Sequence, residues 1–206
     1  MNKNKTRINR YIHSNSVSNL LPILREWIKV NRSLARSWDW KDCPWWCNER
    51  ASVSTLAAAV WKAGGKALEE FCDEKIYRRG RYQGRCDLYF EFRGHKYIVE
   101  AKHIWLAAGR RSHPPTSVLK NAEVEACKDV HHVTETGTKL SIVFAVPYFP
   151  ESDKTHVNRL LKEWQAQLLE IPFHSLAWVF PAQTRHLQWK NDSHYYPGVA
   201  AILHKE

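Results

Sequence analysis

Residues 85–102 constrain the fold of this chain more than any other part of the sequence. Two runs rich in aromatic and β-branched residues, 85–92 and 95–102, flank the dipeptide Arg93-Gly94. A two-residue connection ending in glycine between two such runs is typical of a β-hairpin. The sequence therefore predicts an antiparallel hairpin whose register is fixed by its turn.

The register of this hairpin brings three charged residues together. If Phe92 faces His95 across the turn, then Asp87 lies directly opposite Glu100. Because side chains alternate along a strand, Lys102 shares a face with Glu100. Facing residues have Cβ atoms only about 5 Å apart. The sequence thus predicts two carboxylates and one ammonium on one face of the hairpin. The opposite face is predicted to join the core through Leu88, Phe90, Phe92, Tyr97 and Val99.

Two facing carboxylates repel each other unless something lies between them. A divalent cation would relieve this repulsion, and Mg²⁺ commonly takes one or two carboxylates together with water and phosphate oxygens. Lys102 would then orient or deprotonate an attacking water, or stabilise charge on a phosphate. The alternative is a solvated face, on which Asp87 and Glu100 form surface salt bridges with Lys102.

The remaining chain alternates helical and strand patterns. Apolar spacing predicts helices over 17–31, from Ala51 to Tyr77 or Arg78, over 117–132 and over 153–170, and strands over 140–146 and 175–180. Gly64-Gly65 lies inside the second predicted helix, which suggests close packing there. The expected fold is α/β, with an α/β domain over 51–206. A basic, poorly ordered arm (1–16) and a Trp-rich helical extension occupy 1–50.

The charge balance points to a polyanionic partner, most simply nucleic acid. The 206 residues include 31 Lys and Arg against 21 Asp and Glu, a net charge of +10. Positive charge gathers in residues 1–36, which hold eight basic groups and one acid, and in residues 78–111, which hold nine basic groups and three acids. The alternative is a basic surface that serves only solubility.

Composition also excludes several classes of protein. No apolar run approaches the roughly 20 residues of a membrane span, and residues 1–16 lack the apolar region of a secretory signal. Five cysteines, an odd number without dense spacing, argue against a disulfide framework. We expect a cytoplasmic protein that does not enter membranes.

The combination of Asp87 with Glu100-Ala101-Lys102, separated by twelve intervening residues, resembles the PD-(D/E)xK motif of the restriction-endonuclease-like nuclease superfamily. The resemblance covers roughly residues 52–146. It implies a mixed central sheet flanked by helices, in the order helix, three strands, helix, strand. It also implies Mg²⁺-dependent phosphodiester hydrolysis, in which Mn²⁺ could replace Mg²⁺. Asp87 and Glu100 would be the metal ligands, and Lys102 the catalytic lysine. Cys86 precedes Asp87 where the motif has proline.

The same resemblance suggests a third acid on the first core helix, in a G-x3-E arrangement. Gly65 to Glu69 matches it, which makes Glu69 the third catalytic and metal-binding candidate, and Glu70 competes with it. Arg85, Arg110 and Arg111 are candidate phosphate contacts.

His131-His132 could bind a metal, but adjacent helical residues point about 100° apart, which favours a solvated helix end. The leading hypothesis is a metal-dependent nuclease, most simply a DNA endonuclease. It would act in restriction, in repair, or in the biology of mobile elements or phages. The alternative is a catalytically silent nuclease-fold module that binds nucleic acid or a protein partner. A homodimer would suit double-strand cutting.

Overall fold

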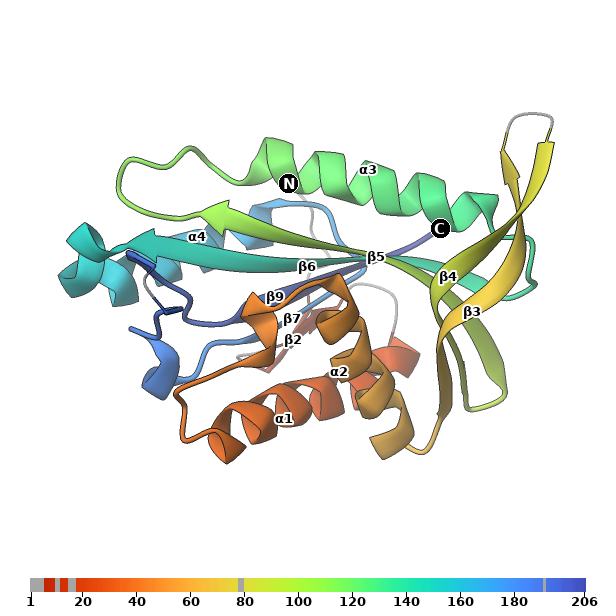
Figure 1. Cartoon of the computed structure of the whole chain (residues 1–206), viewed down its shortest axis with the longest axis horizontal. Helices are drawn as coiled ribbons and strands as arrows, with labels where there is room; N and C mark the ends of the chain where they lie inside the picture. Colours follow the sequence, from red (N-terminus) through yellow and green to blue (C-terminus); the bar gives the residue numbers. More distant parts are fainter. Residues whose placement is uncertain (1–5, 10–11, 15–17, 78–79, 191) are drawn as a thin grey trace.

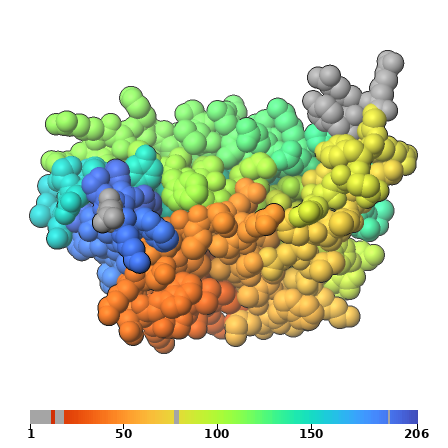
Figure 2. Space-filling model, in the orientation of Figure 1, coloured from red at the N-terminus to blue at the C-terminus, as the bar shows by residue number. Residues whose placement is uncertain are grey.

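The computed structural model describes residues 6–9, 12–14, 18–77, 80–190 and 192–206, drawn as a cartoon in Figure 1 and as a space-filling view in Figure 2. Its centre is a long, twisted sheet with strand order β1-β2-β7-β9-β6-β5-β4-β3, and β8 pairs with β6 beside it (Figure 1). Pairing is parallel between β5 and β6 and antiparallel between the other neighbours, so the sheet is mixed. The strands are β1 (Thr6–Asn9), β2 (Ile12–Ser14), β3 (Lys66–Tyr77), β4 (Gly80–Phe92), β5 (His95–Ala107), β6 (Thr138–Pro150), β7 (Ser175–Val179), β8 (His194–Tyr195) and β9 (Val199–Lys205).

Helices cover both faces of this sheet (Figure 1). They are α1 (Leu21–Ser37), α2 (Glu49–Lys62), α3 (Thr116–His132) and α4 (Val157–Glu170). Strand β6 shows the two layers: Ile142 and Phe144 pack in one apolar cluster with α1 and α2, whereas Val143 and Ala145 pack in a second cluster with α3 and α4. The α/β class predicted from the sequence is therefore confirmed.

The predicted hairpin is confirmed together with its register. Strands β4 and β5 are joined by Arg93-Gly94, Phe92 pairs with His95, and Leu88 pairs with Val99. Gly94 has a φ of +77°, a conformation that glycine adopts without steric cost. The predicted core face is also confirmed, because all five of its residues belong to the cluster beneath α1 and α2: Leu88, Phe90, Phe92, Tyr97 and Val99.

The helix predicted from Ala51 to Tyr77 is wrong in its second half. Helix α2 begins behind Asn48, whose side chain accepts a hydrogen bond from Ala51 N at 2.9 Å, and it ends at Lys62. Gly64 has a φ of +87° and donates to Trp61 O, and Gly65 donates to Val60 O, the pattern of a Schellman helix end. The two glycines terminate the helix. The expected close packing is found at Gly65, where an added Cβ would lie 2.7 Å from Glu91 O and from Val60 Cγ1, but not at Gly64.

Strand β3 occupies the stretch that the sequence pattern assigned to a helix. Its residues pair antiparallel with β4 from Lys66↔Glu91 to Tyr77↔Gly80. Leu68 and Ile76, two of the apolar residues in the predicted helix, are 59% and 43% exposed in this strand. Strand pairing outweighs the local helical spacing here. Glu69 therefore lies on a strand, and its predicted place on the first core helix is wrong.

The other predicted elements are found with small shifts of their ends. Helices α1, α3 and α4 cover 21–37, 116–132 and 157–170, and strands β6 and β7 contain 140–146 and 175–179. The arm differs from the expectation of disorder in its described part, since β2 pairs with β7 through Ile12 and Ala177. Within the described ranges, no helix is long and apolar enough to cross a membrane.

Candidate functional site

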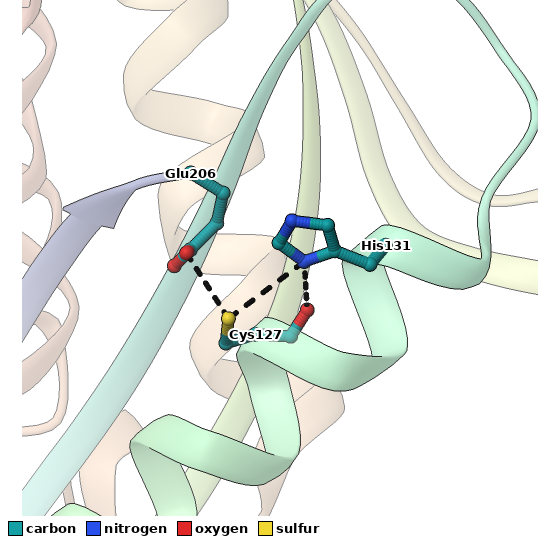
Figure 3. Close-up of side chains that lie close together, drawn as sticks. All are labelled: Cys127, His131 and Glu206. Atoms are coloured by element: carbon teal, nitrogen blue, oxygen red, sulfur yellow. Dashed lines mark hydrogen bonds between the residues drawn. The ribbon is translucent and has the colours of Figure 1, made fainter.

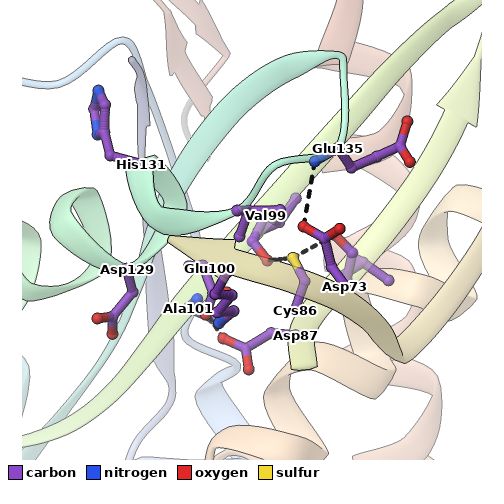
Figure 4. A network of polar contacts seen from close by, with 12 residues as sticks. Asp73, Cys86, Asp87, Val99, Glu100, Ala101, Asp129, His131 and Glu135 are labelled. Atoms are coloured by element: carbon purple, nitrogen blue, oxygen red, sulfur yellow. Dashed lines mark hydrogen bonds and ion pairs between the residues drawn. The ribbon is translucent and has the colours of Figure 1, made fainter. Parts of the chain in front are cut away.

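The candidate site lies where β4 separates from β5. Pairing between the two strands stops at Leu88↔Val99, one residue short of Asp87. There the Asp87 carboxylate takes the place of a backbone partner, because its Oδ2 accepts a hydrogen bond from Ala101 N at 2.7 Å. Figure 4 shows Asp87 beside Glu100 and Ala101. The two acids predicted to face each other are thus neighbours at this opening of the sheet.

Glu100 is buried and paired with a lysine that the sequence analysis did not identify. Its side chain is 5% exposed, and its Oε1 lies 2.6 Å from Nζ of Lys75, which is 11% exposed. The lysine reaches from β3 over β4 at Gly84, where an added Cβ would lie 2.8 Å from Lys75 Cδ. Gly84 therefore leaves the room through which the ammonium reaches Glu100.

The surroundings of Glu100 disfavour its charge in spite of this lysine. Burial raises the pKa of Glu100 to about 7, and the charge of Asp87 adds to the shift, while Lys75 opposes it. A hydrogen bond with Asp87 also favours the protonated form of Glu100. A proton thus partly relieves the repulsion between the two acids, and a cation could take its place.

Lys102 lies on the same face of the sheet as Glu100, the face that α3 covers, and it forms an ion pair with that helix. Its Nζ lies 2.6 Å from Asp129 Oδ2 of α3, and the lysine side chain is 25% exposed. Burial lowers the pKa of Lys102, but the hydrogen bond and charge of Asp129, with the charges of Glu49 and Asp87, outweigh it and raise the pKa overall. Lys102 is therefore a protonated ammonium, oriented by Asp129 and within the field of the acids.

The first turn of α2 brings a further acid to the site. Glu49 Oε2 accepts a hydrogen bond from His103 N at 3.2 Å. Burial raises the pKa of Glu49, and the negative charge of Asp87 is the next largest cause. The neighbouring Ser52 Oγ lies 2.8 Å from His103 Nδ1, so α2 contacts both the backbone and the ring of His103. The His103 side chain is partly buried, and this burial lowers its pKa to about 4 and keeps the ring neutral.

A pocket of about 350 Å³ opens between α2 and the β3–β4 pair. Glu69 lines it and accepts a hydrogen bond from Ser54 Oγ at 2.6 Å. Glu70, with a φ of +52°, lies between Arg50 and Arg85, at 3.2 and 3.3 Å. Four acids and one arginine therefore line the pocket, whose lining residues are Glu49, Arg50, Val53, Ser54, Glu69, Glu70 and Asp87.

The predicted phosphate-contact arginines lie in different surroundings. Arg85 pairs with Glu70 at the pocket, with 65% of its side chain exposed. Arg110 is bound to Asp153, a carboxylate whose side chain is only 4% exposed, through both its guanidinium and its backbone N–H. Arg111 is exposed beside it. Arg110 therefore pairs with a buried carboxylate and Arg85 with a partly exposed one, whereas Arg111 is exposed.

The donor set at this opening fits a hard divalent cation. Asp87 and Glu100 supply carboxylate oxygens, Mg²⁺ needs only one or two of these, and water completes its coordination. The observation that supports this fit is the buried Glu100, whose ionised form lacks full compensation next to Asp87. The charge of Asp87 contributes to the raised pKa of Glu49, whereas the predicted third acid, Glu69, accepts a hydrogen bond from Ser54.

Three residues of the site were missed from the sequence: Glu49, Lys75 and Asp129. Glu49 had a readable signal, since it follows the capping residue Asn48, but the predicted helix began at Ala51. Lys75 and Asp129 had none, because they reach Glu100 and Lys102 through strand pairing and helix packing over 25 and 27 residues of sequence.

In comparisons with known proteins, no family model, curated protein or solved structure matches this chain.

Proposed function

We propose that this protein is a divalent-metal-dependent nuclease that hydrolyses phosphodiester bonds, with DNA as its substrate. The observation that carries the proposal is the meeting of Asp87, the buried Glu100 and the ammonium of Lys102 where β4 and β5 separate. A protein that needed these groups only for solubility would have no reason to bury one carboxylate against another.

The order of elements supports a restriction-endonuclease-like core. Helix α2 is followed by β3, β4 and β5, then by α3 and β6, which is the order helix, three strands, helix, strand. Within this order, β4 carries Asp87, β5 carries Glu100 and Lys102, and the first helix carries an acid, Glu49. The proposed core thus has its charged residues on the elements that the resemblance implies.

Asp87 and Glu100 would hold the cation, Mg²⁺ or Mn²⁺. When bound, the cation would polarise a phosphate oxygen and lower the pKa of a coordinated water. Glu100 must lose its proton to act as a ligand, and Lys75 favours its ionised form through the 2.6 Å contact. Lys75 is thus a positioning residue that keeps Glu100 available.

Of the roles that the sequence leaves open for Lys102, we propose the stabilisation of phosphate charge. Asp129 and the neighbouring acids keep its ammonium protonated, so it does not act as a general base at neutral pH. Its charge would instead stabilise the negative charge that develops on the phosphate. Glu49, whose pKa is raised beside Asp87, is placed to accept a proton or a hydrogen bond from a water in the pocket.

The charge of the chain supports a polyanionic substrate. Its net charge is +10, and Arg50 and Arg85 lie at the pocket with exposed side chains. Phosphate contacts of this kind position a backbone without reading its sequence. DNA is the substrate we propose, and a homodimer would place two such sites on one duplex.

Incubation of the purified protein with supercoiled plasmid tests this proposal. We expect nicking or linearisation in Mg²⁺ or Mn²⁺, none in EDTA, and a loss of ~10²-fold or more in Asp87→Asn. The matched control is Asp192→Asn, which alters a carboxylate that pairs with His194 and Tyr196 and does not line the pocket of the proposed site. Metal-independent cutting, or equal cutting by Asp87→Asn, would contradict the proposal. Tight DNA binding without cleavage would favour the silent binding module instead.

A further inference from the structure

A second group of metal-ligating side chains lies on the outer end of α3, apart from the Asp87–Glu100 opening. Cys127 and His131 are one helical turn apart, so both lie on the same side of α3. Glu206, which follows β9, reaches the same place (Figure 3). One ligand atom from each of the three residues lies within 4.8 Å of the other two, and no other trio of Cys, His, Asp or Glu does so among the described residues.

The distances within this trio suit a small tetrahedral ion. Cys127 Sγ lies 3.0 Å from Glu206 Oε2 and 3.7 Å from His131 Nδ1. Zn²⁺ binds sulfur at about 2.3 Å and nitrogen at about 2.0 Å, so tetrahedral ligands lie about 3.5 Å apart. Coordination by His131 Nδ1 would replace its present 2.7 Å contact with the Cys127 carbonyl oxygen.

The third ligand is held in place by the sheet. Glu206 N donates to Lys139 O at 3.1 Å, and Glu206 Oε1 accepts a hydrogen bond from Ser141 Oγ at 2.5 Å. Its second oxygen, Oε2, is the one directed at Cys127. A carboxylate fixed in this way needs little reorganisation to bind a cation.

The electrostatics of the trio also favour a cation. Burial, the hydrogen bond to Glu206 and the charges of Glu206 and Glu123 raise the pKa of Cys127 to about 11. Glu123 stands one turn before Cys127 on α3, and burial, with the charge of Glu206 as the next cause, raises the pKa of Glu123. Negative groups thus gather around a thiol that would release its proton to a metal ion.

We propose that Cys127, His131 and Glu206 form a binding site for a zinc-class divalent cation, with water in the fourth position. Thiolate and imidazole ligands select Zn²⁺ over Mg²⁺, so this site takes a different ion from the oxygen-only opening at Asp87. The bound ion joins α3 to the end of β9. Because α3 also carries Asp129, the ion holds the helix that orients Lys102.

Binding of Zn²⁺ and Co²⁺ by the full chain tests the site. We expect one Zn²⁺ per chain after dialysis in the presence of excess Mg²⁺, and Co²⁺ spectra with thiolate charge-transfer absorption. His131→Ala and Cys127→Ser should each weaken binding at least ~10-fold and abolish the thiolate absorption or shift the Co²⁺ bands. His132→Ala and Cys72→Ser are the matched controls, one an adjacent histidine and the other an exposed cysteine on β3.

The result separates this site from the proposed active site. Asp87→Asn should retain the Zn²⁺ stoichiometry whatever its effect on cleavage. Binding that is unchanged in both His131→Ala and Cys127→Ser, or that is lost equally in His132→Ala, would overturn the assignment. Absence of bound Zn²⁺ at micromolar concentration in the wild-type chain would overturn it as well.

Discussion

Lys75 Nζ and Glu100 Oε1 lie 2.6 Å apart in an ion pair with side chains only 11% and 5% exposed. The pair joins β3 to β5 across β4, the strand that carries Asp87. An ammonium is thus buried against an acid that is proposed to bind a cation. The stability of the metal-free protein and the chemistry of the site are linked through this contact.

Removal of Lys75 should strongly destabilise the protein. Lys75→Met leaves Glu100 without its counter-charge, and breaking a buried pair from one side costs about 3–5 kcal/mol of unfolding free energy. Arg81→Gln is the control, because it breaks an exposed pair with Glu74 and should cost about 0–1 kcal/mol. Urea unfolding in EDTA measures both variants. Equal losses in the two would show that the Lys75–Glu100 pair is not buried as described.

The two facing acids should differ in their effect on stability. Asp87→Asn removes the charge that disfavours ionised Glu100 and keeps an acceptor for Ala101 N, so the unfolding free energy should stay unchanged or rise. Glu100→Ala instead leaves Lys75 buried and unpaired, at a cost of about 3–5 kcal/mol. Thermal and urea unfolding in EDTA distinguish them. A large loss in Asp87→Asn would contradict the described repulsion.

His103 should make the protein less stable in acid. Burial lowers its pKa to about 4, below the ordinary value of 6.5, so the unfolded chain binds the proton first as the pH falls. This contribution is complete above pH 6.5 and is lost as the pH falls to about 4, by about 3 kcal/mol. His103→Gln should flatten this part of the pH profile, whereas His95→Gln, at an exposed position, should not. Parallel pH profiles for wild type and His103→Gln would show that His103 does not cause this loss of stability.

The basic arm should contribute affinity for DNA and not cleavage. Lys3, Lys5 and Arg10 lie outside the described residues, and Arg7 lies in β1. Each phosphate neutralised adds about 0.9 to the slope of log affinity against log salt, so changing all four to Gln should lower the slope by up to ~3.6. This variant is preferable to deleting residues 1–16, which would also remove β2 from its pairing with β7. An unchanged slope would mean that the arm does not contact DNA.

The hairpin was predictable because its signals are local. The Arg93-Gly94 turn fixes the register, and the alternation along β4 and β5 fixes the faces, so the neighbourhood of Asp87, Glu100 and Lys102 follows from sequence alone. The apolar periods of α1, α3 and α4 are equally local. These elements needed no information from distant parts of the chain.

The errors arose where tertiary structure overrides local pattern. Residues 66–77 have helical spacing, yet all of them except Glu70 pair with β4, and the glycines before them end α2. The misread boundary moved Glu69 onto a helix and hid Glu49, the acid that α2 does carry to Asp87. Lys75 and Asp129 could not be paired with their partners without the arrangement of β3 and α3 in space.

The most direct test of the proposed nuclease is the single-turnover cleavage rate of Lys102→Ala at saturating protein in Mg²⁺, with DNA binding followed in Ca²⁺. The ammonium of Lys102 repels cations and acts on phosphate charge, so binding should stay near the wild-type level while cleavage falls ~10²-fold or more. Lys102→Arg should restore cleavage only in part, because a planar guanidinium does not replace a compact ammonium. Near-wild-type cleavage by Lys102→Ala would contradict the proposed active site and the role of Lys102 in it.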